Sequence, residues 1–133
     1  SICRFYNVYG PHHIRTGSYA TVLGIFEHQF LNNTPITVTA DGEQRRDFTH
    51  IDDIVDALIS CIGKDFRAEE FELGRGKNYS INQIADMFGG DKKYGEKRIE
   101  PKDSVAENAK INLDLDWQSQ GNLKEWITSN KDI

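Results

Sequence analysis

Residues 41–63 read DGEQRRDFTHIDDIVDALISCIG and contain the clearest helix pattern in the chain. Their apolar residues recur at i, i+3, i+4, i+7, i+8 and i+11: Ile51, Ile54, Val55, Leu58, Ile59 and Ile62. This spacing, ended by Gly63, predicts an amphipathic helix whose apolar stripe packs against a core. Asp52, Asp53 and Asp56 lie near its N-terminus, where the helix dipole favours negative charge. We interpret them as helix-start charges rather than catalytic acids.

Four short segments around this helix have the composition of strands. They are rich in β-branched or aromatic residues or border turn residues: Ile2–Val8, Ile36–Thr39, Arg46–Ile51 and Phe71–Leu73. Four short strands are too few for an independent doubly wound sheet, so we expect a small α/β fold whose strands need neighbours that this chain does not supply. The first strand begins at position 2 with no initiator Met before it, so the chain reads as part of something longer.

Three further helices are predicted from capping residues and apolar spacing. The first is expected after Ser18 as its N-cap and ends before Pro35. The second follows Ser80, which together with Gln83 has the form of a capping box, and the third follows Asn122. Residues 91–110 are rich in charged and poor in apolar side chains, which predicts a solvated, irregular stretch.

Composition and charge exclude several classes of protein. The 133 residues carry 16 Lys+Arg and 21 Asp+Glu, for a net charge of −5. Net acidity disfavours a nucleic-acid partner, because phosphate contacts need a basic face. The apolar stretches fall far short of the roughly 20 residues that span a bilayer, so we expect no membrane partner and a cytoplasmic protein. Cys3 and Cys61 lack zinc-site spacing, and we expect two buried small apolar residues and no disulfide framework.

Two further motifs carry weak chemical signals. His12 and His13 are neighbours in a loop, where adjacent side chains diverge, and no third ligand is spaced nearby. We therefore expect surface histidines and no metal site. Gly74-Arg75-Gly76 lacks the third glycine of a dinucleotide-binding loop and suits a turn.

The arginines offer a more specific possibility. Arg45 and Arg46 lie in a loop with glycine, amide and aromatic groups, and Arg98 lies in the charged stretch. A guanidinium makes two parallel hydrogen bonds to phosphate oxygens, and two converging guanidinium groups would hold a diphosphate. The alternative is that these arginines are surface ion-pair partners of Asp47 and Glu100.

Three stretches occur in order along the chain: RFYNVYGP at 4–11, DGEQRRDFTHIDD at 41–53 and FELGRGKNYSI at 71–81. Together they resemble the C-terminal, substrate-binding part of the NAD-dependent nucleotide-sugar epimerase/dehydratase family, the extended short-chain dehydrogenases that include UDP-glucose 4-epimerase-like enzymes. The resemblance covers residues 1–133. It implies a small mixed α/β substrate-binding lobe with the N-terminal NAD-binding Rossmann part missing.

The resemblance also implies site residues. Asn7 would hydrogen-bond the sugar diphosphate, and Arg46 and Arg98 would bind the diphosphate. Glu100 or Asp103 would take the acidic position beside the ribose of the nucleotide. Thr37, Val38 and Thr39 would belong to the segment whose backbone meets the base. Val22 and Leu23 would stand at the start of the helix that covers the substrate.

Two family elements are missing from this sequence. No G-x-x-G-x-x-G loop occurs, and none of the five tyrosines has Lys four positions later. The resemblance therefore implies the UDP-sugar-binding part of an NAD-dependent 4-epimerase, which contributes no catalytic residue, binds no cofactor by itself and is inactive alone. Part of a 4,6-dehydratase, a non-catalytic nucleotide-sugar-binding module and a fold relic without a ligand remain alternatives. The oligomeric state is left open.

Overall fold

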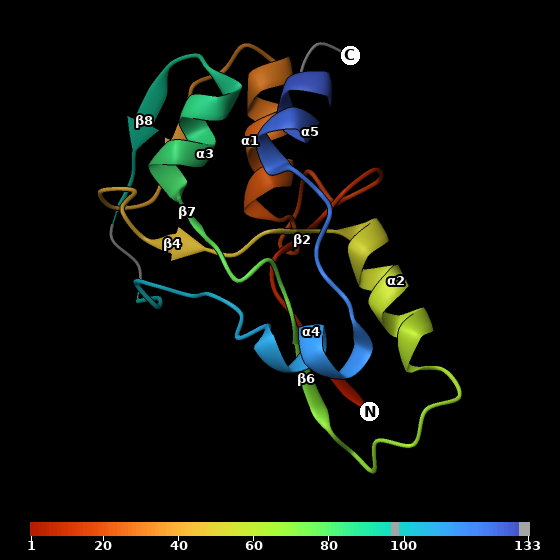
Figure 1. Ribbon diagram of the computed structural model, residues 1–133. Coiled ribbons are helices and arrows are strands. Elements are labelled where there is room, and N and C mark those ends of the chain that lie inside the picture. Colours follow the sequence, from red (N-terminus) through yellow and green to blue (C-terminus); the bar gives the residue numbers. More distant parts are fainter. Residues whose placement is uncertain (97–98, 131–133) are drawn as a thin grey trace.

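The computed structural model describes residues 1–96 and 99–130 (Figure 1). The helices of this part of the chain are α1 (Val22–Leu31), α2 (Ile51–Cys61), α3 (Ile81–Phe88), α4 (Ala109–Leu115) and α5 (Leu123–Asn130). Its strands are β1 (Ile2–Phe5), β2 (Val8–Tyr9), β3 (Ile36–Val38), β4 (Arg45–Arg46), β5 (Thr49–His50), β6 (Glu70–Leu73), β7 (Tyr79–Ser80) and β8 (Lys92–Tyr94). The expected small mixed α/β fold is confirmed.

The strands associate in pairs rather than in one sheet. β1 pairs with β6, β2 with β5 and β3 with β8 in parallel, whereas β4 and β7 are antiparallel. Cys3 of β1 lies opposite Phe71 of β6. Parallel strands are normally buried within larger sheets that have both faces covered. Among the described strands, β1 has no partner along its other edge.

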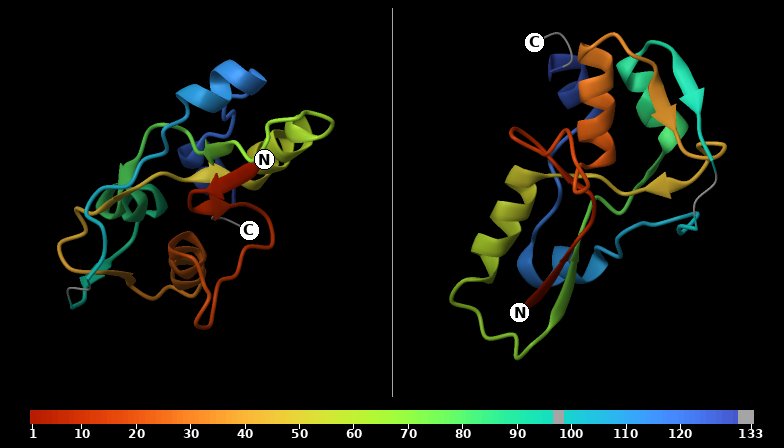
Figure 2. Two further views of the ribbon diagram at one scale, coloured as in Figure 1. Left: turned by 90° about the horizontal axis from the view of Figure 1, so that it is seen from below. Right: turned by 180° about the vertical axis from the view of Figure 1, so that it is seen from behind.

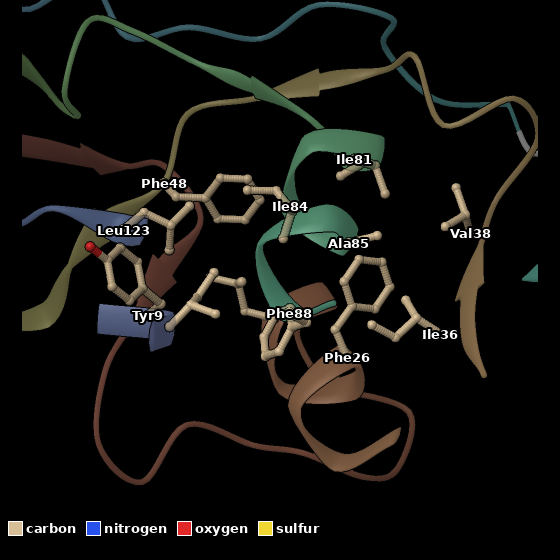
Figure 3. Close-up of a cluster of buried hydrophobic side chains, with 12 residues drawn as sticks. Tyr9, Phe26, Ile36, Val38, Phe48, Ile81, Ile84, Ala85, Phe88 and Leu123 are labelled. Atoms are coloured by element: carbon tan, nitrogen blue, oxygen red, sulfur yellow. The ribbon is translucent and has the colours of Figure 1, made fainter. Parts of the chain in front are cut away.

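Two groups of buried apolar side chains hold these elements together. The first core lies among α1, α3, α5 and β3, in the upper part of Figure 1 and enlarged in Figure 3. Phe26 and Phe88 meet there edge to face, with ring centroids 6.2 Å apart. The second core lies among α2, α4 and β6: Ile54, Ala57, Phe71, Leu73, Ile111 and Trp117. Figure 2 shows the arrangement of these helices and strands from below and from behind.

Caps fix the starts of the helices of the first core. Ser80 accepts from the Gln83 backbone N–H at 3.1 Å, and the Gln83 side chain accepts from the Ser80 N–H at 2.8 Å, so the predicted capping box is confirmed. The prediction of Ser18 as the N-cap of α1 is wrong. Thr21 caps this helix, since its hydroxyl accepts from the Gly24 N–H at 3.0 Å.

Helix α2 begins at the first residue of the predicted pattern and ends one residue before its last, but its environment is not the predicted one. Ile54 and Ala57 are buried in the second core. The other apolar residues of the stripe are between 37% and 76% exposed: Ile51, Val55, Leu58, Ile59 and Ile62. One side of the stripe packs in the second core. No described element covers the other side, which is why these residues are exposed (Figure 1). The expectation that the stripe faces a core is therefore wrong for most of its length.

Residues 91–110 are more ordered at both ends than their composition predicts. β8 forms at the start of this stretch because its backbone pairs with β3, with Thr37 opposite Lys93. At the other end begins α4, which buries Ile111 in the second core. Tertiary partners thus override the polar local sequence at these two places. No helix of the described part is long and apolar enough to cross a membrane.

Candidate functional site

A cavity of about 400 Å³ opens between α1, β3 and the loop that carries β4. The apolar part of its wall comes from α1 and the first core, including Phe26, Phe48 and Ile81. Most residues that the resemblance singles out line it together: Asn7, Val22, Leu23, Thr37, Thr39, Arg46 and Glu100. An apolar hollow with a few converging polar groups has the general form of a small-molecule site.

Asn7 stands at the bend between β1 and β2. Its φ of 23° lies on the left-handed side of the backbone map, which Asn tolerates better than most residues. The side-chain N–H donates to the backbone oxygen of Asp47 at 3.1 Å, and the Asn7 carbonyl accepts from the Thr49 N–H at 3.3 Å. These bonds hold the Asn7 amide at the cavity wall beside the β4 loop.

Arg46 faces the cavity because side chains alternate along a strand. Its neighbour Arg45 turns to the other side and donates to the Asn78 side-chain oxygen at 2.9 Å. The Arg46 side chain is only 15% exposed and forms an ion pair with Glu100 at 3.5 Å. One guanidinium N–H also donates to the Arg45 carbonyl at 2.7 Å. The ion pair weighed as an alternative thus forms with Glu100, inside the cavity and not on an open surface.

Asp47, the residue after this arginine, attaches the β4 loop to two other segments of the chain, and sequence reasoning missed this role. Its carboxylate is fully buried and accepts backbone N–H bonds from Arg75 at 2.9 Å, Gly76 at 3.0 Å and Ala106 at 3.0 Å. A Cβ at Gly74 would lie 2.8 Å from a carboxylate oxygen of Asp47, so this close approach needs glycine. The G-x-G turn therefore binds a protein carboxylate.

Two of the singled-out residues do not line the cavity, and a third cannot be placed among the described residues. The side chain of Val38 is buried in the first core, and its carbonyl accepts from the Gly95 N–H at 2.7 Å. Asp103 accepts from the Asn78 side chain at 2.5 Å and does not line the cavity. Arg98 lies outside the described residues.

The loop before α1 is attached by a buried contact between His13 and Glu27. His13, expected at the surface, has a side chain only 8% exposed, and its Nε2 lies 2.6 Å from the Glu27 carboxylate. Arg15 binds the other oxygen of Glu27, and the His13 ring meets Trp126 edge to face. A buried carboxylate needs such partners, which explains why the expectation of a surface histidine is wrong. No group of three or more His, Cys, Asp or Glu among the described residues could hold a metal ion.

Asp53 has a comparable structural role at the start of α2. Its two oxygens accept from the Gln120 N–H at 3.0 Å, the Gly121 N–H at 2.9 Å and the Ser119 hydroxyl at 3.1 Å. The helix-start charge proposed from the sequence therefore also attaches the segment that leads into α5. The sequence could not have identified this role, because Asp53 is one of three acidic residues near the helix start and nothing in the pattern distinguishes it from the exposed Asp52.

Two curated proteins that resemble this chain over nearly its whole length are both named as sugar-nucleotide 4-epimerases. The chain is 31% identical to the UDP-glucuronate 4-epimerase of Thermodesulfobacterium geofontis, over 96% of this chain and 40% of the relative. It is 29% identical to the dTDP-L-rhamnose 4-epimerase of Burkholderia thailandensis, over 99% of this chain and 40% of the relative. The chain thus spans less than half the length of these curated relatives.

The fold also matches solved structures. The UDP-glucose 4-epimerase of Thermotoga maritima with UDP-glucose superposes with a TM-score of 0.89 at 26% identity, covering 98% of this chain and 44% of that one. The UDP-glucuronic acid 4-epimerase of Bacillus cereus, in complex with UDP-glucuronic acid and NAD, gives 0.85 at 25% identity, covering 98% and 43%. A family model described as "NAD dependent epimerase/dehydratase family" matches residues 1–74. With its motifs, cavity and fold in agreement, the chain belongs to the NAD-dependent epimerase/dehydratase family.

Proposed function

We propose that residues 1–133 are the nucleotide-sugar-binding part of an NAD-dependent 4-epimerase, with a UDP-sugar as the ligand. The observation that carries this proposal is the cavity in which Asn7, Arg46 and Glu100 meet against the apolar wall of α1. Relatives named as UDP-sugar 4-epimerases, one of them in complex with UDP-glucose, support the choice of ligand.

The polar groups of the cavity suit the parts of such a ligand. A diphosphate is costly to bury unless it is paired, and Arg46 offers a shielded guanidinium. In the free chain Glu100 is the counterion of Arg46. We infer that the diphosphate replaces it, which frees the Glu100 carboxylate to accept hydrogen bonds from ribose hydroxyl groups. Asn7 would donate to the diphosphate, and the β3 segment at Thr37 and Thr39 would meet the base.

We infer that the described residues do not form an NAD site by themselves. Gly74–Gly76 is the only G-x-G segment of the sequence, and the N–H groups of Arg75 and Gly76 already donate to Asp47. Hydride transfer in a 4-epimerase is chemistry that NAD supplies when it is bound. The role proposed for this chain is therefore to bind and orient the sugar nucleotide, and we expect no epimerase activity from it alone.

We further propose that an NAD-binding part in a complete enzyme covers the open edge of β1 and the exposed side of α2. Phe5 of β1 is 53% exposed, Ile59 of α2 is 59% exposed, and Ile62, which caps the end of α2, is 76% exposed. Exposed apolar surface gathered on one element is typical of an interaction site. A further parallel strand along β1 would also give the β1–β6 pair the larger sheet that parallel strands need.

Replacing both Ile59 and Ile62 by Lys tests this surface. We expect the 133-residue chain to bind a hydrophobic fluorescent dye and the double variant to bind much less of it, while affinity for UDP stays unchanged because neither residue lines the cavity. Leu113→Lys is the matched control, since Leu113 is an exposed apolar residue of α4. If dye binding falls equally in the Leu113→Lys control, the exposed side of α2 is not the main apolar surface of the chain.

Thermal unfolding in the presence of nucleotides tests the ligand. At a concentration one hundred times Kd, UDP is expected to raise Tm by on the order of 10 °C, because ligand binding stabilises only the folded chain. dTDP and ADP are run in parallel to read the base preference. A rise with dTDP alone would assign the site to dTDP-sugars, and no rise with any nucleotide would contradict the proposed site.

A further inference from the structure

The two cysteines meet although they are far apart in the sequence. Cys3 lies in β1 and Cys61 is the last residue of α2, and their sulfur atoms are 4.0 Å apart. Both side chains pack against the second core and remain partly accessible. The sequence predicted two buried small apolar residues, but both cysteines are only partly buried. Their contact was not predicted, because nothing in a separation of 58 positions indicates it.

We propose that Cys3 and Cys61 are an oxidative modification site that closes to an intramolecular disulfide. The sulfur atoms must approach by about 2 Å to reach the bond length of a disulfide, which side-chain rotation can supply without unfolding either element. The pair lies beside the second core, away from the cavity that holds Arg46, so the proposal does not depend on the proposed function.

The chemistry balances with a small-molecule disulfide as the oxidant. One cysteine thiolate attacks oxidised glutathione, forms a mixed disulfide and releases one reduced glutathione. The second cysteine then attacks the protein sulfur of this mixed disulfide and releases a second reduced glutathione. The two protein thiols lose two protons and two electrons, and one oxidised glutathione becomes two reduced molecules. Burial and the nearby Cys61 raise the pKa of Cys3, so this residue is mostly a protonated thiol at neutral pH and its attack on an oxidant is slowed.

The bond would connect the last turn of α2 to β1. It would close a loop of 58 positions, which restricts the unfolded chain, and Tm is expected to rise by on the order of 10 °C. It would also hold the exposed side of α2 in a fixed orientation relative to the open edge of β1.

Intact mass spectrometry of the 133-residue chain under non-reducing conditions tests the site. After treatment with oxidised glutathione, the wild-type chain is expected to lose two hydrogen atoms, show no free thiol and melt at the higher temperature, all reversed by dithiothreitol. Cys3→Ser and Cys61→Ser are the matched controls. Each is expected to accumulate a single glutathione adduct without the rise in Tm, and circular dichroism checks that each is folded.

Three outcomes would overturn the proposal. In the first, the wild-type chain keeps both thiols after treatment. In the second, it ends with stable glutathione adducts, and in the third it forms disulfide-linked dimers. Because the wild-type protein decides among these outcomes, the test does not depend on whether a serine variant folds.

Discussion

Replacing Arg46 by Ala is expected to weaken UDP binding by about 2–5 kcal/mol, which is more than tenfold in Kd. The Arg46 side chain is 15% exposed, and within the described residues its only ion pair is with Glu100. A diphosphate buried at this place without Arg46 would have no comparable cation beside it. Calorimetric titration with UDP measures the loss. Arg46→Lys keeps the charge but not the two parallel donors, so an intermediate loss is expected.

Arg45→Ala is the matched control for this effect. Arg45 lies next to Arg46 in β4, but its side chain donates to Asn78 and does not line the cavity. Its removal lowers the net charge by the same amount and should leave UDP affinity within about twofold once the variant is shown to be folded. Equal losses in the two variants, or no loss in Arg46→Ala, would remove Arg46 from the site.

Asp47→Ala is expected to lower the free energy of unfolding by about 3–5 kcal/mol. The substitution leaves three backbone N–H groups without their acceptor, one of which, that of Ala106, donates in a fully buried bond. Asp47→Asn should also be strongly destabilising, because its amide N–H would oppose some of these donors. Denaturant-induced unfolding measures both effects.

Asp65→Ala provides the comparison for Asp47. The Asp65 side chain is 81% exposed and lies 3.9 Å from Arg67, a surface arrangement that contributes little. Its replacement should change stability by less than about 0.5 kcal/mol. A loss at Asp47 as small as the loss at Asp65 would mean that the buried carboxylate does not hold the β4 loop in place.

Local signals predicted the parts of the fold that depend on nearby residues. The capping box at Ser80 and the cap at Asn122, which accepts from the Glu125 N–H at 3.1 Å, involve partners three positions away. Periodicity also gave the start of α2 and, to within one residue, its end. It did not show that Ile59 and Ile62 are exposed, because a periodic pattern identifies an apolar face but not what covers it.

Long-range contacts explain what the sequence did not predict. The partners of Asp47 lie 28 to 59 positions away, and those of Asp53 lie 66 to 68 positions away, so no local pattern reports them. His13 is buried because α1 brings Glu27 beside it. The cavity was better predicted, since ordered motifs pointed to Asn7 and Arg46 and strand alternation places Arg46 on the cavity side of β4.

Calorimetric titration of the 133-residue chain with UDP, UDP-glucose and NAD, each alone, tests the central claim most directly. The account predicts binding of UDP and UDP-glucose, because Arg46 and its neighbours already form a cavity, and no binding of NAD at the same concentrations. The opposite pattern, in which NAD binds and neither UDP nor UDP-glucose does, would contradict the assignment of this chain to sugar-nucleotide binding.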